Sequence, residues 1–357
     1  MKEMKINTRQ ICFIMLAYTA AAKLLLYPTI LSQLCGRDLL FPAALSFLTE
    51  GIVIWSVAYL CSRTDKTFYG LLQNTLGTVV ARIIYGLFAL FFLMSALVPV
   101  FEQKQYVHNI FYDTVPSIGI FLPFFVFAAY AASKKLINIG RCADVCLPIF
   151  AVCMLFLFAM AIPEVEWDNF LPVLKTPAKS IFGGYVGTAF NFAEPCWLLM
   201  LMGHFKYKKG DAARITLSYA GGAAFVLIFL AVFYGMYGAV APSRTFAVAR
   251  TSLFFPAIET LGRIDLIILL TLEMVMLFAL ALNIQLSVHC ISKCVDWNNY
   301  MVLSFIVNAA LMIVIIVCDS SYNSIYRLYY RWSWLPVLVF TVLIPLAAWA
   351  LKRRKRE

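Results

Sequence analysis

The segment Gly183-Gly-Tyr-Val-Gly-Thr-Ala-Phe-Asn-Phe-Ala-Glu-Pro195 interrupts an apolar stretch that runs from about 179 to 203. Its three glycines allow the backbone to unwind or to approach a neighbour closely, and Pro195 removes a helical hydrogen bond near Asn191. Irregular backbone at membrane depth is tolerated only where it is buried in protein or lines a wet cavity. The segment therefore predicts a helix that is broken inside a membrane.

A second stretch, close to the N-terminus, has the same character. Polar and small residues lie at the centre of the first apolar segment in Ala17-Tyr-Thr-Ala-Ala-Ala-Lys23, and Tyr27-Pro28 follows. Because Pro28 lacks an amide donor, the helix is expected to weaken around residues 19–27. Either interruption alone is better explained as a packing kink. Paired interruptions at corresponding positions of two halves, however, indicate a midplane binding site in inverted-repeat transporters.

The residues expected to contact a ligand lie within these two interruptions. They are Thr19, Ala20, Ala21, Lys23, Tyr27, Gly184, Gly187 and Asn191. Four charges also lie inside apolar sequence, where an ionised side chain costs about 2.5–3.5 kcal/mol. These intramembrane charges are Lys23, Glu50, Glu194 and Glu273. Each should face the interior of the bundle and be paired or titrated.

Lys23 has two interpretations that the sequence leaves open. Its ammonium group could face the central cavity, where it would balance an acidic partner or engage an anionic group of the ligand. It could equally form a structural ion pair, with Glu50 or Glu273 as partner. Glu194 beside Pro195 is expected to accept hydrogen bonds from backbone amides at the start of the second half-helix, a structural role favoured over ligand contact.

The composition indicates that lipid is the solvent of this chain. Of its 357 residues 63% are apolar and 13% charged, against about 45–50% and about 25% in soluble domains. Apolar runs of about 20 residues recur, the length that crosses about 30 Å of hydrocarbon. We expect one all-α membrane domain over 1–357, with one repeat over about 8–162, a second over about 179–351 and a basic tail at 352–357. The expected spans lie near 11–34, 39–61, 80–102, 116–132, 140–162, 179–203, 215–241, 264–288, 299–318 and 333–351.

The basic residues predict the orientation of these spans. With ten spans both termini lie on one side, and that side holds 19 of the 29 Lys and Arg residues, against nine on the other side and Lys23 within a span. By the positive-inside rule both termini are cytoplasmic. The basic tail could instead bind acidic lipid or a partner. The external segment Pro163–Pro172 is either an ordered cap over a vestibule or an ordinary loop with aromatic anchors.

Several classes of function find no support in the sequence. The net charge of +11 lies in loops and tails, so it marks topology and not nucleic-acid binding. No phosphate-binding loop, hydrolase serine motif or zinc-protease motif occurs, so no enzymatic activity and no cofactor is expected. Cysteine pairs at 142/146 and 290/294 lack clustered histidines, so neither a metal site nor a disulfide framework is predicted.

The chain resembles the endospore germination permeases, the B subunits of the GerA-type nutrient germinant receptors. Similar stretches are Ile6-Asn-Thr-Arg-Gln10, Leu24-Leu-Leu-Tyr-Pro28, Gly36-Arg-Asp38, Tyr112-Asp-Thr-Val-Pro116, Gly140-Arg-Cys-Ala-Asp144, Trp167-Asp-Asn-Phe-Leu-Pro-Val-Leu174 and Phe190-Asn-Phe-Ala-Glu194. They occur in the family's order from about residue 6 to the tail. Lys23 departs from the small or hydroxyl residue usual in the family, and Ala193 from the usual glycine, so the ligand class does not carry over.

The resemblance implies the ten-helix, five-plus-five inverted-repeat fold of the amino acid/polyamine/organocation permeases (the LeuT-like fold), with helices one and six broken. It also implies a small nutrient germinant, commonly an amino acid, as ligand. Partners would be a receptor A subunit and a lipoprotein C subunit in the inner membrane of a bacterial spore. The leading hypothesis is therefore a ligand sensor with little net transport. A proton- or sodium-coupled transporter of amino acids or amines is the alternative, although an ammonium at Lys23 argues against a sodium site nearby.

Overall fold

The computed structural model describes residues 6–64, 66–111, 117–134, 136–205, 207–252, 265–318, 322–347 and 350. Residues 1–5, the predicted 112–116 motif and the basic tail 352–357 lie outside the described residues. Within the described parts the chain is helical, apart from linkers, turns and an isolated bridge between Ile6 and Phe205. The prediction of an all-α protein is confirmed for these residues.

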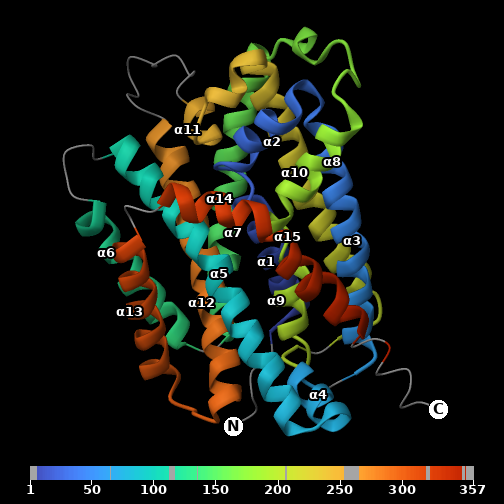
Figure 1. The fold of residues 1–357 in the computed structure, drawn as a ribbon, viewed down its shortest axis with the longest axis vertical. Helices are drawn as coiled ribbons and strands as arrows, with labels where there is room; N and C mark the ends of the chain where they lie inside the picture. Colours follow the sequence, from blue (N-terminus) through green and yellow to red (C-terminus); the bar gives the residue numbers. More distant parts are fainter. Residues whose placement is uncertain are drawn as a thin grey trace.

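The elements follow one another as short and long helices (Figure 1). In chain order they are α1 (Thr8–Ala21), α2 (Tyr27–Cys35), η1 (Gly36–Asp38), α3 (Leu40–Ser62), α4 (Phe68–Leu76), α5 (Thr78–Phe111), α6 (Ser117–Ser133), α7 (Leu136–Ala161), η2 (Ile162–Glu164), η3 (Trp167–Phe170), α8 (Ala178–Gly187), η4 (Ala189–Asn191), α9 (Glu194–Met200), α10 (Asp211–Tyr237), η5 (Gly238–Ser243), α11 (Ala247–Ser252), α12 (Asp265–Val295), α13 (Tyr300–Cys318), α14 (Tyr322–Trp332), α15 (Trp334–Val337) and the π-helical η7 (Leu338–Leu343).

Six stretches of these helices are long enough and apolar enough to cross a membrane. They are Leu40–Ser62, Thr78–Tyr106, Ile137–Glu164, Asp211–Ser243, Leu266–Val295 and Tyr300–Cys318. Helices also cover most of the described residues of the other expected spans, but these are shorter or interrupted. The count of ten crossings stays a prediction.

The helix α3 shows how the sequence is arranged for lipid. Its apolar residues Leu48, Ile52 and Trp55 are 64%, 60% and 53% exposed, whereas Glu50 on the same helix is only 6% exposed. Water would favour the opposite arrangement, because exposed apolar surface is unfavourable there and a buried carboxyl loses its hydration. In lipid the charge must face the protein interior. The placement of Glu50 therefore agrees with a membrane environment.

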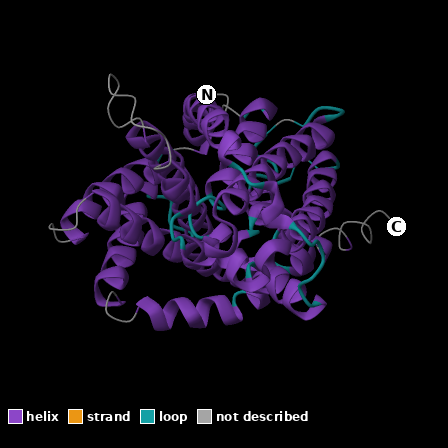
Figure 2. Cartoon of the chain, turned by 90° about the horizontal axis from the view of Figure 1, so that it is seen from above, coloured by secondary structure: helices purple, strands orange, loops and turns teal. Residues whose placement is uncertain are grey.

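The helix α1 occupies the centre of the bundle and packs against α7, α10 and α12. The helix α10 in turn packs against α3, and α12 packs against α5. A second hydrophobic cluster joins α5, α6, α12 and α13 through residues such as Ala96, Leu280 and Leu303. Seen from above, loop segments lie inside the bundle as well as at its rim (Figure 2).

Three helices, α4, α11 and α14, lie outside the apolar spans expected from the sequence. The helix α4 follows α3 at the end of the molecule where α1 begins (Figure 1). The helix α14 contains Arg327 and Arg331, which lie between the expected spans 299–318 and 333–351. Arg327 and Arg331 lower the mean hydropathy of this segment, so it does not resemble an apolar span. Their spacing of four residues places both on one face of the helix and leaves aromatic residues on the other, which makes the helix amphipathic. Tyr329 on α14 lies 5.2 Å, between ring centroids, from Phe190 of η4.

The segment between α7 and α8 packs against the end of α10 and against η1. The amide of Glu166 and the side-chain amide of Asn169 both donate to the carbonyl of Gly235 on α10, at 3.2 and 2.8 Å. The buried carboxylate of Asp38 accepts hydrogen bonds from the amides of Leu174 (2.7 Å) and Thr176 (2.8 Å). Of the two alternatives for this segment, the ordered cap agrees with these contacts.

We expect Asp38→Asn to loosen this cap. Burial acts to raise the pKa of the Asp38 carboxyl, but the hydrogen bonds from Thr176 and Leu174 and the nearby Arg37 guanidinium together lower that pKa below its usual value. The carboxylate therefore stabilises the cap above the unfolded pKa of about 3.9, and this stability is lost as the pH falls through the folded value. An asparagine presents only one acceptor oxygen to two amides, which costs about 1–3 kcal/mol at neutral pH.

Hydrogen exchange of the amides of Leu174 and Thr176 measures this effect. The protection of these two amides should be lower in Asp38→Asn than in the wild type. In the wild type it should decrease as the pH falls through the pKa of the Asp38 carboxyl, and in the variant this decrease should be absent. The control is Asp168→Asn, which changes an exposed acid in the same segment. Equal protection in both variants would contradict the assignment of Asp38 as the anchor.

Candidate functional site between the two helix breaks

The first break lies between α1 and α2, at residues 22–26. It ends where Pro28 stands in the first turn of α2, a position that needs no amide donor. The carbonyl of Leu25, freed by the break, accepts a hydrogen bond from the amide of Ala247 at 2.9 Å. Buried backbone groups need such partners. The break is thus stabilised by α11, and it falls within the predicted region 19–27.

The second break lies between α8 and α9. The chain forms the short 3-10 turn η4, then runs without helical structure through Phe192 and Ala193 before α9 starts at Glu194. Pro195 stands in the first turn of α9, as Pro28 does in α2. Tyr27 and Phe192 pack edge to face with centroids 6.0 Å apart, so the two breaks lie side by side.

Lys23 and Glu194 join the two breaks through a buried ion pair. The Lys23 ammonium contacts Oε1 of Glu194, and both side chains are 0% exposed. The partner of Lys23 is therefore Glu194, and the sequence-based proposal of Glu50 or Glu273 is wrong. The partner depends on the rotation of each half-helix about its axis, which spacing along the chain does not define.

Two aromatic rings complete the surroundings of the ammonium group. The Nζ atom of Lys23 lies 4.6 Å from the ring centroid of Phe192 and 5.7 Å from that of Phe47. A desolvated cation over a ring gains about 2 kcal/mol or more. Burial of each ion costs several kcal/mol. The carboxylate and the two rings together offset this cost.

Glu50 extends the cluster to α3 and α10. Its Oε1 accepts a hydrogen bond from the backbone amide of Glu194 (3.2 Å), and its Oε2 accepts one from the hydroxyl of Tyr219 (2.6 Å). The second oxygen of Glu194 accepts a hydrogen bond from the amide of Ala193 at 2.9 Å. Glu194 therefore accepts a hydrogen bond from the backbone of the residue before α9, in addition to its ion pair with Lys23.

The other expected ligand residues fall into two groups. Thr19, Ala20 and Ala21 form the last buried turn of α1, and the hydroxyl of Thr19 has no hydrogen-bond partner in the described part of the chain. Asn191 is nearly buried and donates to the carbonyl of Thr188 at 3.3 Å. The glycines of α8 instead serve packing against α2. A Cβ atom at Gly184 would lie 2.4 Å from Sγ of Cys35, and one at Gly187 would lie 3.3 Å from Leu34.

Comparison with known protein families shows the family of this chain. A family model described as spore germination protein matches residues 5–323. The chain belongs to this family of spore germination proteins. The family resemblance inferred from the sequence is thereby confirmed. No functionally curated protein matches the chain.

Solved structures show which fold this germination-family chain shares. It is similar to MhsT in complex with L-phenylalanine, with a TM-score of 0.59 and 13% identity over 89% of this chain and 81% of that one. It is also similar to a mutant manganese transporter of Eremococcus coleocola, with a TM-score of 0.58 and 11% identity over 95% of this chain and 78% of that one. The similarity shows the fold of LeuT-like transporters.

Glu273 belongs to a different part of this germination-family chain. It lies on α12 and accepts a hydrogen bond from the side-chain amide of Gln103 on α5. A surface pocket of about 330 Å³ is lined by residues that include Arg37, Lys175 and Tyr234, and Lys23 does not line it. In the described residues no group of three or more His, Cys, Asp or Glu side chains could hold a metal ion.

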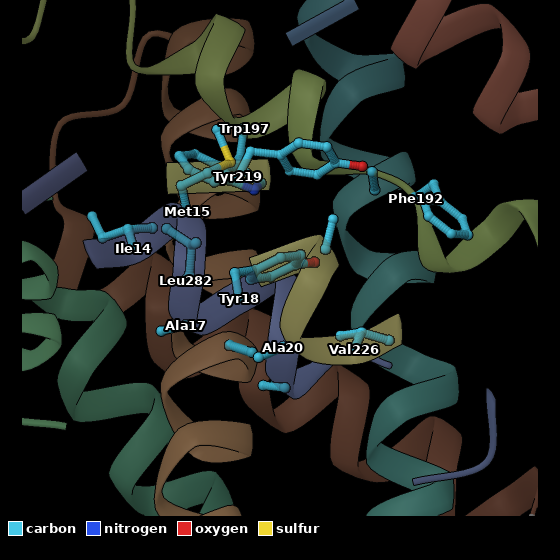
Figure 3. Close-up of a cluster of buried hydrophobic side chains, with 14 of the residues drawn as sticks. Ile14, Met15, Ala17, Tyr18, Ala20, Phe192, Trp197, Tyr219, Val226 and Leu282 are labelled. Carbon is cyan, nitrogen blue, oxygen red and sulfur yellow. The ribbon is translucent and has the colours of Figure 1, made fainter. Parts of the chain in front are cut away.

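Three aromatic residues of the site, Phe192, Phe47 and Tyr219, were not among the residues predicted from the sequence. Phe192 lies in the predicted break, so its position gave a signal that could have been used. Phe47 and Tyr219 lie on the regular helices α3 and α10 and carry no such signal. Their rings are 6.3 Å apart, and Phe47 is 5.2 Å from Phe192. Tyr219 and Phe192 lie in one cluster with Tyr18 and Trp197 (Figure 3).

Proposed function

We propose that the chain is the permease-like B subunit of a nutrient germinant receptor. It binds a small nutrient germinant, an amino acid or a similar molecule, between the two helix breaks. The observation that carries this proposal is the buried Lys23–Glu194 pair, because it places opposite charges where both backbones are irregular. Membership in the spore germination family supports the biological context.

The proposed architecture is the one expected from the sequence. One membrane domain crosses the inner membrane of a bacterial spore about ten times, with repeats over about 8–162 and 179–351 and with both termini and the basic tail cytoplasmic. The partners are a receptor A subunit and a lipoprotein C subunit, and no enzymatic activity is involved. The six long apolar helices support the membrane location.

The proposed mechanism is a shift between two conformations. A ligand moves such an equilibrium only by its difference in affinity for the two states. The Lys23–Glu194 pair connects the linker between α1 and α2 to the start of α9. A ligand that changes this contact therefore alters the relative position of the two broken helices. The partner subunits respond to that change.

Spores carrying the complete receptor offer a direct test at Thr19. Its hydroxyl is buried and has no hydrogen-bond partner among the described residues, so Thr19→Val keeps the shape and breaks no known protein contact. If the hydroxyl binds the germinant, the half-maximal concentration in an amino-acid panel should rise about three- to tenfold, the value of one hydrogen bond. The measurement is the loss of spore refractility at unchanged subunit level.

The control is Thr216→Val, whose hydroxyl donates to the carbonyl of Ala212 in its own helix. Spores that lack the chain should not respond to the germinant at all. A normal response in such spores would contradict the receptor function. Accumulation of the germinant by the chain alone in lipid vesicles would instead favour the alternative of a proton- or sodium-coupled transporter.

A further inference from the structure

Lys23 is enclosed in the way that proteins enclose a bound ammonium ligand. Its Nζ atom contacts the Glu194 carboxylate and lies over the rings of Phe192 and Phe47. These rings are 5.2 Å apart and inclined by 73°, so they form two walls of a corner. An anion combined with aromatic faces is the usual recognition site for organic ammonium groups. We call Glu194, Phe192 and Phe47 the ammonium cage.

The cage is held in place by contacts that do not involve Lys23. The Glu194 carboxylate accepts a hydrogen bond from the amide of Ala193, and the amide of Glu194 donates to Glu50. Tyr219 fixes the other oxygen of Glu50 and also lies next to Phe47. The cage would therefore keep its shape if the Lys23 ammonium left.

The occupant, in contrast, lies on a segment without regular helical structure. Lys23 lies in the non-helical linker 22–26, and its amide donates to the carbonyl of Ala20 in a single turn. A displacement of its side chain breaks no regular helix, since α1 ends at Ala21 and α2 begins at Tyr27. The ammonium cage is thus formed by residues of regular or anchored segments, whereas Lys23 reaches it from a non-helical linker. This arrangement is the one expected if the Lys23 side chain acts as a ligand that belongs to the chain itself.

We propose that the ammonium cage is the recognition site for the primary ammonium group of the ligand, and that Lys23 occupies it until such a group takes its place. The proposal rests on the proposed function, because it names the chemical class of the ligand as an amine or amino acid. Lys23 then acts as a competitor built into the chain. A competitor of this kind reduces the apparent affinity for the ligand in proportion to the fraction of time that the cage is free.

Chemical rescue of Lys23→Ala tests the cage directly. The substitution removes the alkylammonium part of the side chain, and n-propylammonium has a similar size and charge. The full chain is purified in lipid nanodiscs and its thermal unfolding midpoint is measured. Added n-propylammonium should raise the midpoint of Lys23→Ala by at least about 3 °C at saturation, since a ligand that binds only the folded state stabilises it. It should bind the wild type at least about tenfold more weakly.

Three controls make the result specific to the cage. Propionate and n-propanol have similar size but lack the positive charge, and neither should stabilise Lys23→Ala. The double variant Lys23→Ala/Glu194→Gln lacks the anion, and n-propylammonium should not stabilise it either. If Lys23→Ala is recovered only when n-propylammonium is present during purification, that recovery is itself rescue.

The proposal is overturned if n-propylammonium restores neither the recovery nor the midpoint of Lys23→Ala. It is also overturned if propanol acts equally well, or if the wild type binds n-propylammonium as tightly as the variant does. These outcomes concern the cage alone. A failure of the proposed function would appear separately, as spores that germinate normally without the chain.

Discussion

Lys23→Met is expected to lower the free energy of unfolding by about 3–5 kcal/mol, because breaking a buried pair by removing one partner leaves an uncompensated buried charge. The side chain of Glu194 is 0% exposed, so its carboxylate does not face solvent. Its hydrogen bond from the Ala193 amide does not neutralise the carboxylate. Thermal or denaturant unfolding in lipid nanodiscs measures the loss.

The double variant Lys23→Met/Glu194→Gln separates the charge from the packing. Replacing both members of a buried pair by uncharged groups of similar volume is often neutral or stabilising. The double variant should therefore recover most of the loss caused by Lys23→Met alone. Lys175→Met, which changes an exposed lysine in the segment before α8, serves as the matched control and should stay within about 0.5 kcal/mol. Additive losses in the double variant would refute a coupled pair.

The positions of the two breaks were predictable because they follow from local chemistry. Proline cannot continue a helix from the preceding turn, so Pro28 and Pro195 place the start of each second half-helix. Both prolines do stand in the first turn of α2 and α9. The burial of Lys23 and Glu50 was equally predictable, since lipid excludes charge from the outer surface.

The partners of these charges were not predictable from a single sequence. Which carboxylate meets Lys23 depends on how α9 is rotated and on how far it is displaced along α3. Those quantities follow from packing over whole helices and not from any local pattern. For the same reason Tyr219 gave no signal, although its hydroxyl holds Glu50. The ligand role of the expected site residues remains a prediction for the experiments above.

The turn that follows α9 requires a glycine, which the sequence alone did not reveal. After Met200 the chain turns through Gly203, whose φ angle is +82°. A Cβ atom there would lie 2.8 Å from the backbone nitrogen and 2.9 Å from the Cα atom of Thr67. Beyond the turn, the amide of Ile6 donates to the carbonyl of His204 at 3.2 Å. The turn thus anchors the half-helix that carries Glu194.

Gly203→Ala is expected to cost about 2–5 kcal/mol in unfolding free energy. A left-handed conformation costs a residue with a side chain about 1–2 kcal/mol. The clash adds about 1–3 kcal/mol, because the atoms in the way belong to the backbone and cannot rotate aside. The measurement is the unfolding midpoint in lipid nanodiscs, with the chain otherwise unchanged.

Gly210→Ala isolates the conformational part of this cost. Gly210 also has a positive φ angle, +95°, but a Cβ atom at this position meets no other atom within 4 Å. It should therefore lose only the conformational share, about 1–2 kcal/mol. If the two variants lose the same stability, the close contact between Gly203 and Thr67 does not anchor α9. A larger loss in Gly203→Ala means that the close contact between Gly203 and Thr67 contributes to the stability of the turn that follows α9.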